Sequence, residues 1–197
     1  MLRQSLRVGV DIDGVLADQT REILRRISQR SGQKFRKRHV TAWNAKLAEF
    51  DIEREIEDAL DRDPSYIRGM PLLPGVRRSL AVLATKHEII AITHRSAETR
   101  QVTEEWLRAK GLPVQRVEYT RGSSKADVQV DVLVDDNPRN VQEFADTDGI
   151  AILFTQPWNR AFRIEDPKIL RANNWEEVLE TICRVEVGQT KKEAQTL

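Results

Sequence analysis

Short runs rich in apolar and β-branched residues recur along the chain, and each gives way to polar residues. Such runs are typical of the buried strands of a parallel sheet. They predict five strands, at residues Arg7–Asp11, Glu88–Thr93, Val114–Tyr119, Val130–Asp135 and Ile150–Phe154.

Apolar residues at helical spacing lie between most of these runs. They predict helices over residues 19–30 ending at Gly32, from Pro74-Gly75 with Val76, Leu80 and Leu83 on one face, from Ser96 to Gly111, and from Asn174 to about Val185. Strands that alternate with helices indicate an α/β fold, with a Rossmann-like parallel five-stranded sheet as its core.

Residues 17–73 break this alternation, because they are rich in charge and show helical periodicity without a convincing strand. We expect a small helical cap inserted after the first strand. The expected division is therefore an α/β core of residues 1–16 and 74–186, a helical cap of residues 17–73, and a polar C-terminal tail of residues 187–197.

Composition narrows the class of protein. The chain has 197 residues, of which 40% are hydrophobic and 32% charged, and its formal net charge is +1. This balance argues against a strongly basic nucleic-acid binder. The single cysteine, Cys183, excludes an intrachain disulfide and a cysteine zinc cluster, and we expect it to be a small buried side chain. No segment resembles a signal peptide or a membrane span, so we expect a cytoplasmic protein without a membrane partner.

Polar residues that could carry chemistry follow the predicted strands or lie in one loop. They are Asp11 and Asp13, Thr93, Lys125 in the loop RGSSKAD, and Asp135 with Asp136. Ligands of open parallel sheets bind beyond the carboxyl ends of the strands. Converging carboxylates repel one another unless a cation joins them, and oxygen ligands favour Mg²⁺. A lysine and a threonine beside such a cation suit the oxygens of a phosphate. One aspartate could then attack phosphorus, and a second, two residues on, could protonate the leaving oxygen.

The motif DIDGVLAD, a threonine that ends a strand, a lysine and then VLVDD together resemble the haloacid dehalogenase superfamily of phosphotransferases. The resemblance implies that Asp11 is the nucleophile and forms an aspartyl-phosphate, and that Asp13 is the general acid and then the general base. It also implies that Thr93 and Lys125 hold the phosphoryl group. Mg²⁺ would be bound by the Asp11 carboxylate, the Asp13 backbone carbonyl and the Asp135-Asp136 pair, with the direct ligand of that pair left open.

A closer resemblance is to the 5′(3′)-deoxyribonucleotidase-like branch, through VLVDDNPRNV, FTQPWNR and the position of the cap. His94, after Thr93, departs from what we expect of that branch; it is either a substrate-binding residue or a hydrogen-bonded loop residue. Trp43 in the cap either stacks on a base or packs in the cap core. Trp158 is either structural or in contact with substrate.

The sequence therefore predicts a Mg²⁺-dependent phosphomonoesterase that acts on a small phosphorylated metabolite, with a nucleoside or deoxynucleoside 5′-monophosphate as the leading candidate. The alternatives are a sugar-phosphate or nucleic-acid-end phosphatase, and a phosphate-binding module with little turnover. The expected partner is a small-molecule phosphate ester rather than extended nucleic acid, because an extended track needs a basic stripe. A homodimer is left open.

Overall fold

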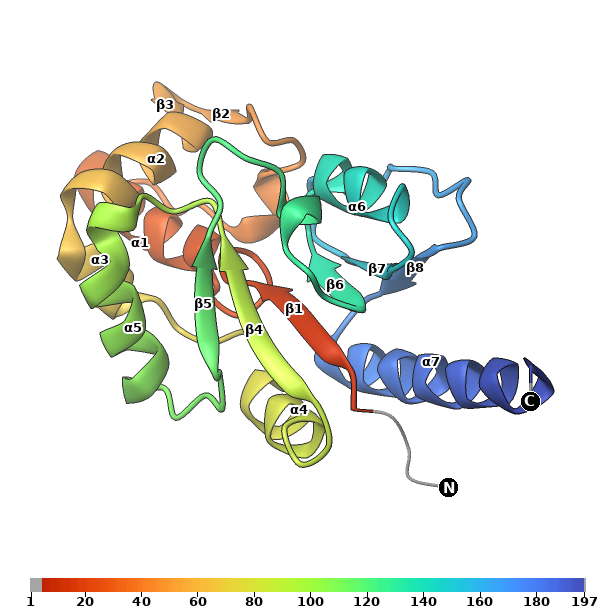
Figure 1. Ribbon diagram of the computed structural model, residues 1–197. Helices are drawn as coiled ribbons and strands as arrows, with labels where there is room; N and C mark the ends of the chain where they lie inside the picture. Colours follow the sequence, from red (N-terminus) through yellow and green to blue (C-terminus); the bar gives the residue numbers. More distant parts are fainter. Residues whose placement is uncertain (1–4, 197) are drawn as a thin grey trace.

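The computed structural model describes residues 5–196, and its centre is a parallel sheet of six strands (Figure 1). The order across the sheet is β5-β4-β1-β6-β7-β8. The strands are β1 (Arg7–Asp11), β4 (Glu88–Thr93), β5 (Arg116–Tyr119), β6 (Val132–Asp135), β7 (Ile150–Phe154) and β8 (Ile169–Ala172). The predicted α/β fold with a parallel sheet is confirmed.

The expected number of five strands is wrong, because β8 adds a sixth at the edge of the sheet. This strand has four residues, and two of them, Leu170 and Arg171, are only partly buried. A short edge strand of this kind has no continuous apolar run to mark it. β5 and β6 also begin two residues later than predicted, within the usual uncertainty of element ends.

Helices cover both faces of the sheet. On one face lie α4 (Val76–Leu83) and α7 (Trp175–Thr196), whose buried residues join the same core cluster as Val8 and Val10 of β1. On the other face, α6 (Pro138–Ala145) packs Val141 and Phe144 against the second core cluster. α5 (Arg100–Ala109) buries Trp106, and the Trp106 indole N–H donates to the Met70 carbonyl at 3.0 Å.

The segment expected to form the cap lies beyond the carboxyl ends of the strands (Figure 1). It contains α1 (Gln19–Ser31), α2 (Ile52–Arg62), α3 (Pro64–Gly69) and a 3₁₀ turn at Lys37–His39. The aspartates before α1, α2 and α3 accept hydrogen bonds from backbone N–H groups of the first turns, as N-cap residues do.

The expectation that the cap has no strand is wrong. A small antiparallel hairpin joins β2 (Lys46–Leu47) to β3 (Phe50–Asp51). Each strand has two residues, which is too short for an alternating pattern to appear in the sequence. The turn places Ala48 at φ +53°, an unusual conformation for a non-glycine residue, so its sequence gives no turn signal either.

α7 is longer than predicted and continues to Thr196 instead of ending near Val185. The added residues include Lys, Glu, Gln and Ala, which favour a helix even without an apolar face. Cys183 is exposed on this helix, so the expectation that it is buried is wrong. None of the helices in residues 5–196 combines the length and the apolar character needed to cross a bilayer.

Trp175 ties α7 to the loop after β1. Its side chain is fully buried, and its indole N–H donates to the Val15 carbonyl at 2.9 Å. Gly75 packs closely against Trp175, since a Cβ added at Gly75 would lie 3.0 Å from the Trp175 Cβ. The first residue of the last helix therefore supports the backbone that follows Asp11 and Asp13.

Trp175→Phe is expected to lower the free energy of unfolding by about 1–3 kcal/mol, because it removes the donor to a buried carbonyl. Urea unfolding followed by circular dichroism measures this change. Glu176→Gln, on the exposed neighbour, is the matched control and should change the value by less than about 0.5 kcal/mol. Equal effects of the two substitutions would contradict the assigned role of the indole.

Candidate active site

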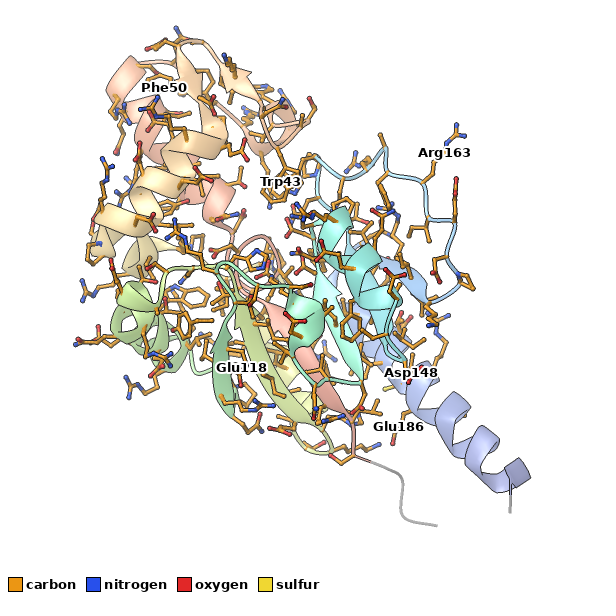
Figure 2. All side chains as sticks on the ribbon, turned by 45° about the horizontal axis from the view of Figure 1, so that its top comes forward. Trp43, Phe50, Glu118, Asp148, Arg163 and Glu186 are labelled. Atoms are coloured by element: carbon orange, nitrogen blue, oxygen red, sulfur yellow. The ribbon has the colours of Figure 1, made fainter. Side chains whose placement is uncertain are left out.

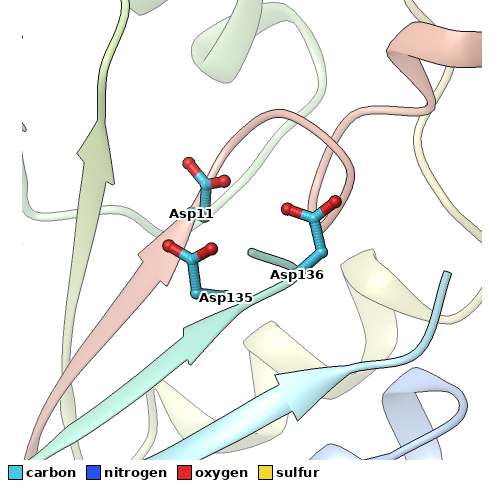
Figure 3. A group of neighbouring side chains, drawn as sticks. All are labelled: Asp11, Asp135 and Asp136. Carbon is cyan, nitrogen blue, oxygen red and sulfur yellow. The ribbon is translucent and has the colours of Figure 1, made fainter. Parts of the chain in front are cut away.

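Three neighbouring strands bring the predicted residues to one edge of the sheet. β4, β1 and β6 are adjacent and parallel, and they end at Thr93, Asp11 and Asp135 respectively. The carboxyl ends of parallel strands meet at the same edge, so these side chains converge. Figure 3 shows Asp11, Asp135 and the next residue, Asp136, grouped above the strand ends.

The three aspartates form a compact acidic cluster. One carboxylate oxygen from each of Asp11, Asp135 and Asp136 lies within 4.8 Å of the others. Asp11 is 7% exposed, and the other two are fully buried. The Oδ1 atom of Asp136 is buried and has no hydrogen-bond partner in the described part of the chain.

Lys125 is the cation that lies within this cluster. Its Nζ is 2.8 Å from Asp11 Oδ1 and 2.7 Å from Asp135 Oδ2, and its side chain is 2% exposed. A short 3₁₀ turn, Lys125–Asp127, holds the lysine, and the hydroxyl of Ser124 caps the turn. Burial alone would lower the pKa of Lys125, but the charges of Asp11 and Asp135 outweigh it, so the pKa is raised and the lysine stays charged.

The pKa values of Asp11 and Asp136 are raised by their surroundings. Burial raises the pKa of Asp11 to about 7; Lys125 opposes this rise, and the charges of Asp135 and Asp13 add to it. Burial, together with the charges of Asp11 and Asp135, raises the pKa of Asp136 well above its usual range. A hard divalent cation among these oxygens would offset their repulsion, and Asp136 Oδ1, which has no hydrogen-bond partner among the described residues, would coordinate it. The donor set therefore fits Mg²⁺.

Asp13 lies apart from the acidic cluster and forms a bidentate ion pair. Arg95 Nε donates to Asp13 Oδ2 and Arg95 Nη2 donates to Asp13 Oδ1, both at 2.7 Å. The Arg95 side chain is 1% exposed and also donates to Thr103 Oγ1 at 3.1 Å. Sequence reasoning missed Arg95, although it stands two residues after Thr93 in THRS. An arginine in a loop after a strand usually points to solvent, and only the fold shows that this one is buried.

A cavity of about 540 Å³ lies above the strand ends. The predicted residues in its wall are Asp11, Asp13, Thr93, His94, Lys125, Asp136 and Trp43. Asp135 is the exception, because it lies beneath the others and is fully buried. Thr93 is 1% exposed, and its hydroxyl accepts a hydrogen bond from the Arg95 backbone N–H at 3.2 Å. His94 is exposed.

Helix α2 supplies further cavity-lining residues that sequence reasoning did not identify. Ile56 and Leu60 of α2 line the cavity. On the same helix, Asp61 accepts two hydrogen bonds from Arg121, at 2.7 and 2.9 Å, and both residues also line the cavity. Because Arg121 lies in the loop after β5, this exposed ion pair joins α2 to that loop at the cavity.

Two tryptophans connect the acidic cluster to the cap. The Trp158 indole N–H donates to Asp136 Oδ2 at 2.9 Å, and the Trp158 ring lies 5.2 Å from the Trp43 ring between centroids. Figure 2 shows Trp43 on the side of residues 17–73 that is nearest to α6. Trp158 therefore has a structural contact, whereas Trp43 both packs on Trp158 and faces the cavity.

Comparison with known proteins identifies a family. Residues 4–188 match the family described as 5′ nucleotidase, deoxy (pyrimidine), cytosolic type C protein. A "putative 5′(3′)-deoxyribonucleotidase" of Chlorobaculum tepidum is 29% identical over 197 residues, covering 92% of this chain and 92% of the relative. A 5′(3′)-deoxyribonucleotidase of Clostridium acetobutylicum is 23% identical over 171 residues, covering 86% and 91% of the two chains.

Solved structures agree on the fold. A haloacid dehalogenase-like family hydrolase from Xanthomonas campestris superposes with a TM-score of 0.62 at 14% identity. The superposition covers 95% of this chain and 99% of the other. At this identity the likeness concerns the fold, and it agrees with the resemblance to the haloacid dehalogenase superfamily that the motifs indicated.

Gly14 allows the loop after β1 to approach Asp136. Its φ is +85°, and a Cβ added there would be 2.4 Å from Asp136 Oδ2. Gly32 has a similar φ of +71° but nothing within 4 Å of an added Cβ. The two glycines therefore separate the effect of backbone conformation from the effect of the contact.

Gly32→Ala is expected to lower the free energy of unfolding by about 1–2 kcal/mol, the usual penalty of a left-handed residue with a Cβ. Gly14→Ala should lower the free energy of unfolding by at least about 1 kcal/mol more than Gly32→Ala does, because the added Cβ must displace the Asp136 carboxylate. Urea unfolding of both variants measures the difference. A Gly14→Ala variant as stable as Gly32→Ala would show that the contact with Asp136 is unimportant.

Proposed function

The chain belongs to the family of 5′ nucleotidase, deoxy (pyrimidine), cytosolic type C proteins and is therefore a hydrolase of the phosphatase class, and we propose that it hydrolyses a nucleoside or deoxynucleoside 5′-monophosphate. The observation that supports this most strongly is that the buried residues Asp11, Lys125 and Asp136 line one cavity together with Trp43 and residues of α2.

Asp11 is the proposed nucleophile. Its Oδ1 accepts hydrogen bonds from Lys125 Nζ at 2.8 Å and from the Ile12 backbone N–H at 2.7 Å. Because both donors hold Oδ1, we assign the attack on phosphorus to Oδ2. The new bond from Oδ2 to phosphorus forms as the bond from phosphorus to the ester oxygen breaks, which yields an aspartyl-phosphate. Thr93 and Lys125 hold the phosphoryl oxygens during this step.

Asp13 is the proposed general acid and base. Two residues after Asp11, it lines the same cavity, and the bidentate bonds from Arg95 hold its carboxylate in one orientation. Asp13, in its protonated form and with one oxygen released from Arg95, gives its proton to the leaving ester oxygen in the first step. In the second step it takes a proton from the water that attacks phosphorus; the bond from phosphorus to Asp11 Oδ2 breaks, phosphate leaves and Asp13 is protonated again. Arg95 contributes by positioning this carboxylate.

Mg²⁺ fits the acidic cluster, and the hydrogen bonds suggest which of the paired aspartates binds it. Asp135 accepts from three donors: Lys125 Nζ at 2.7 Å, Asn140 Nδ2 at 3.0 Å and the Asn137 backbone N–H at 2.8 Å. Asp136 keeps Oδ1 without a partner. We therefore assign direct binding to Asp136, Asp11 and the Asp13 backbone carbonyl, whereas Asp135 positions Lys125. When bound, Mg²⁺ offsets the negative charge of the phosphate and the carboxylates.

The size of the cavity and the residues that line it support a nucleotide as the substrate. A volume of about 540 Å³ is in the range of sites for small organic ligands. With the phosphate at Lys125 and Thr93, the rest of the substrate faces Trp43, Ile56 and Leu60 of the cap. An aromatic ring and two aliphatic side chains suit the flat face of a base. His94, in the loop after β4, also lines the cavity and is assigned to substrate binding. A cytoplasmic location stays a prediction from the sequence.

Asp11→Asn is expected to lower phosphate release from nucleoside 5′-monophosphates with Mg²⁺ by at least about 10³-fold, because the amide is a poor nucleophile. Chelation by EDTA should abolish release by the unmodified protein. The matched control is Asp148→Asn, an exposed aspartate before β7 at the opposite edge of the sheet, which should retain full activity (Figure 2).

Full activity of a folded Asp11→Asn variant would contradict the covalent mechanism. The panel should include sugar phosphates, and their preference over nucleotides would favour the sugar-phosphate alternative. If the unmodified protein binds phosphate with Mg²⁺ but releases none from any ester, the phosphate-binding alternative would be favoured.

Asp136→Asn is expected to abolish the effect of Mg²⁺ on thermal stability. At about 100 times its dissociation constant, Mg²⁺ should raise the melting temperature of the unmodified protein by about 5–10 °C. Asp148→Asn should keep this shift, and differential scanning fluorimetry measures it without any substrate. A shift of normal size in Asp136→Asn would show that the cation binds elsewhere.

A further inference from the structure

Three buried side-chain polar atoms in the cavity wall have no hydrogen-bond partner among the described residues. They are Asp136 Oδ1, Gln19 Oε1 and Trp43 Nε1. Buried polar groups are nearly always paired in folded proteins, so three in one cavity call for an explanation. The proposed cation accounts for Asp136. An acceptor on Gln19 and a donor on Trp43 remain, and both belong to groups that a ligand in this cavity could satisfy.

Gln19 is well placed to meet the leaving group near the reacting phosphate. After Asp13 the chain turns back on itself: the Gly14 N–H donates to the Ala17 carbonyl at 3.0 Å, and Asp13 pairs with Ala17 in an isolated bridge. α1 begins two residues later, at Gln19. The Tyr66 hydroxyl donates to the Gln19 carbonyl at 3.0 Å and fixes this backbone. Gln19 therefore follows closely on the turn that carries Asp13, the proposed acid for the leaving oxygen.

The Gln19 side chain has a buried amide oxygen that a ligand could pair with. The residue is only 3% exposed, so water does not satisfy its amide as it would on the surface. Gln19 lines the cavity, and because the terminal torsion of glutamine is soft, its amide can present either the oxygen or the nitrogen to a ligand. A hydroxyl both donates and accepts, so it pairs with either end of that amide.

We propose that Gln19 is a specificity-determining residue that binds the sugar hydroxyl next to the phosphoester, which in a nucleoside 5′-monophosphate is the 3′-hydroxyl. This inference rests on the proposed function, since it concerns the leaving group of the same reaction. A site that binds a hydroxyl with a buried amide discriminates against a substrate without it, because the amide is then left unpaired. Trp43, which also lines the cavity, meets the part of the substrate farther from the phosphate.

The test compares thymidine 5′-monophosphate with its 2′,3′-dideoxy counterpart, which lacks only the 3′-hydroxyl. For the unmodified protein with Mg²⁺, kcat/KM should be about 10- to 100-fold higher for the hydroxyl-bearing ester. In Gln19→Met, which keeps the length of the side chain and removes the amide, this ratio should fall to about 1. Circular dichroism checks that the variant is folded.

Gln29→Met is the matched control, since Gln29 lies exposed on the same helix and should keep the ratio of the unmodified protein. If Gln19→Met does not fold, Gln19→Asn withdraws the amide by one methylene and should also lower the ratio. A ratio near 1 in the unmodified protein, or an unchanged ratio in a folded Gln19 variant, would overturn the inference.

p-Nitrophenyl phosphate separates failure of the inference from failure of the proposed function. If the unmodified protein hydrolyses both nucleotides as well as this ester but does not prefer the nucleotide with the 3′-hydroxyl, only the inference fails. If it hydrolyses this ester but neither nucleotide, the phosphatase assignment stands, whereas the proposed nucleotide substrate and the inference both fail. If it hydrolyses none of the three esters, the proposed function fails, and the inference fails with it.

Discussion

The buried lysine between Asp11 and Asp135 is the interaction on which the arrangement of the site depends. A charged ammonium group without water needs carboxylates close by, and those carboxylates, buried in turn, need the lysine. This mutual requirement joins the ends of β1 and β6 to the turn that holds Lys125. It also leaves the cluster with more negative than positive charge, which is the condition that makes a divalent cation and a phosphate group complementary occupants.

Around this centre, each element that approaches the site is fixed by a specific polar contact. Arg95 joins the loop after β4 to Asp13, and Trp158 joins the segment after β7 to Asp136. Trp175 joins the last helix to the loop between Asp13 and α1. These contacts come from regions of the chain far apart in sequence. All of them hold the backbone or the carboxylates of the segments that follow β1 and β6. Catalytic geometry of this kind depends on supporting residues as much as on the reacting ones.

The sequence predicted the position of the site better than its surroundings. Asp11, Thr93 and Asp135 could be placed together because strands that end in polar residues share one edge of a parallel sheet. Arg95 could not, because nothing local distinguishes a buried arginine from a solvated one; its burial depends on Asp13, 82 residues away. Ile56 and Leu60 have the spacing of a buried helical face, and sequence alone does not say that this face borders a cavity. β8 and the β2-β3 hairpin are too short for periodicity to show.

The apolar core has a consequence for how the cap can move. Ile23, Leu24 and Ile27 of α1 belong to the same continuous cluster as Val8 and Val10 of the central strand. This first cap helix is therefore built into the body of the protein and cannot swing away without exposing the main core. α2 and the hairpin join the same cluster through fewer fully buried side chains, Ile52 and Phe50, and α2 also contacts the loop after β5 through the exposed pair of Asp61 and Arg121. α1, with Gln19 at its start, is thus anchored in the main core next to the loop that carries Asp13.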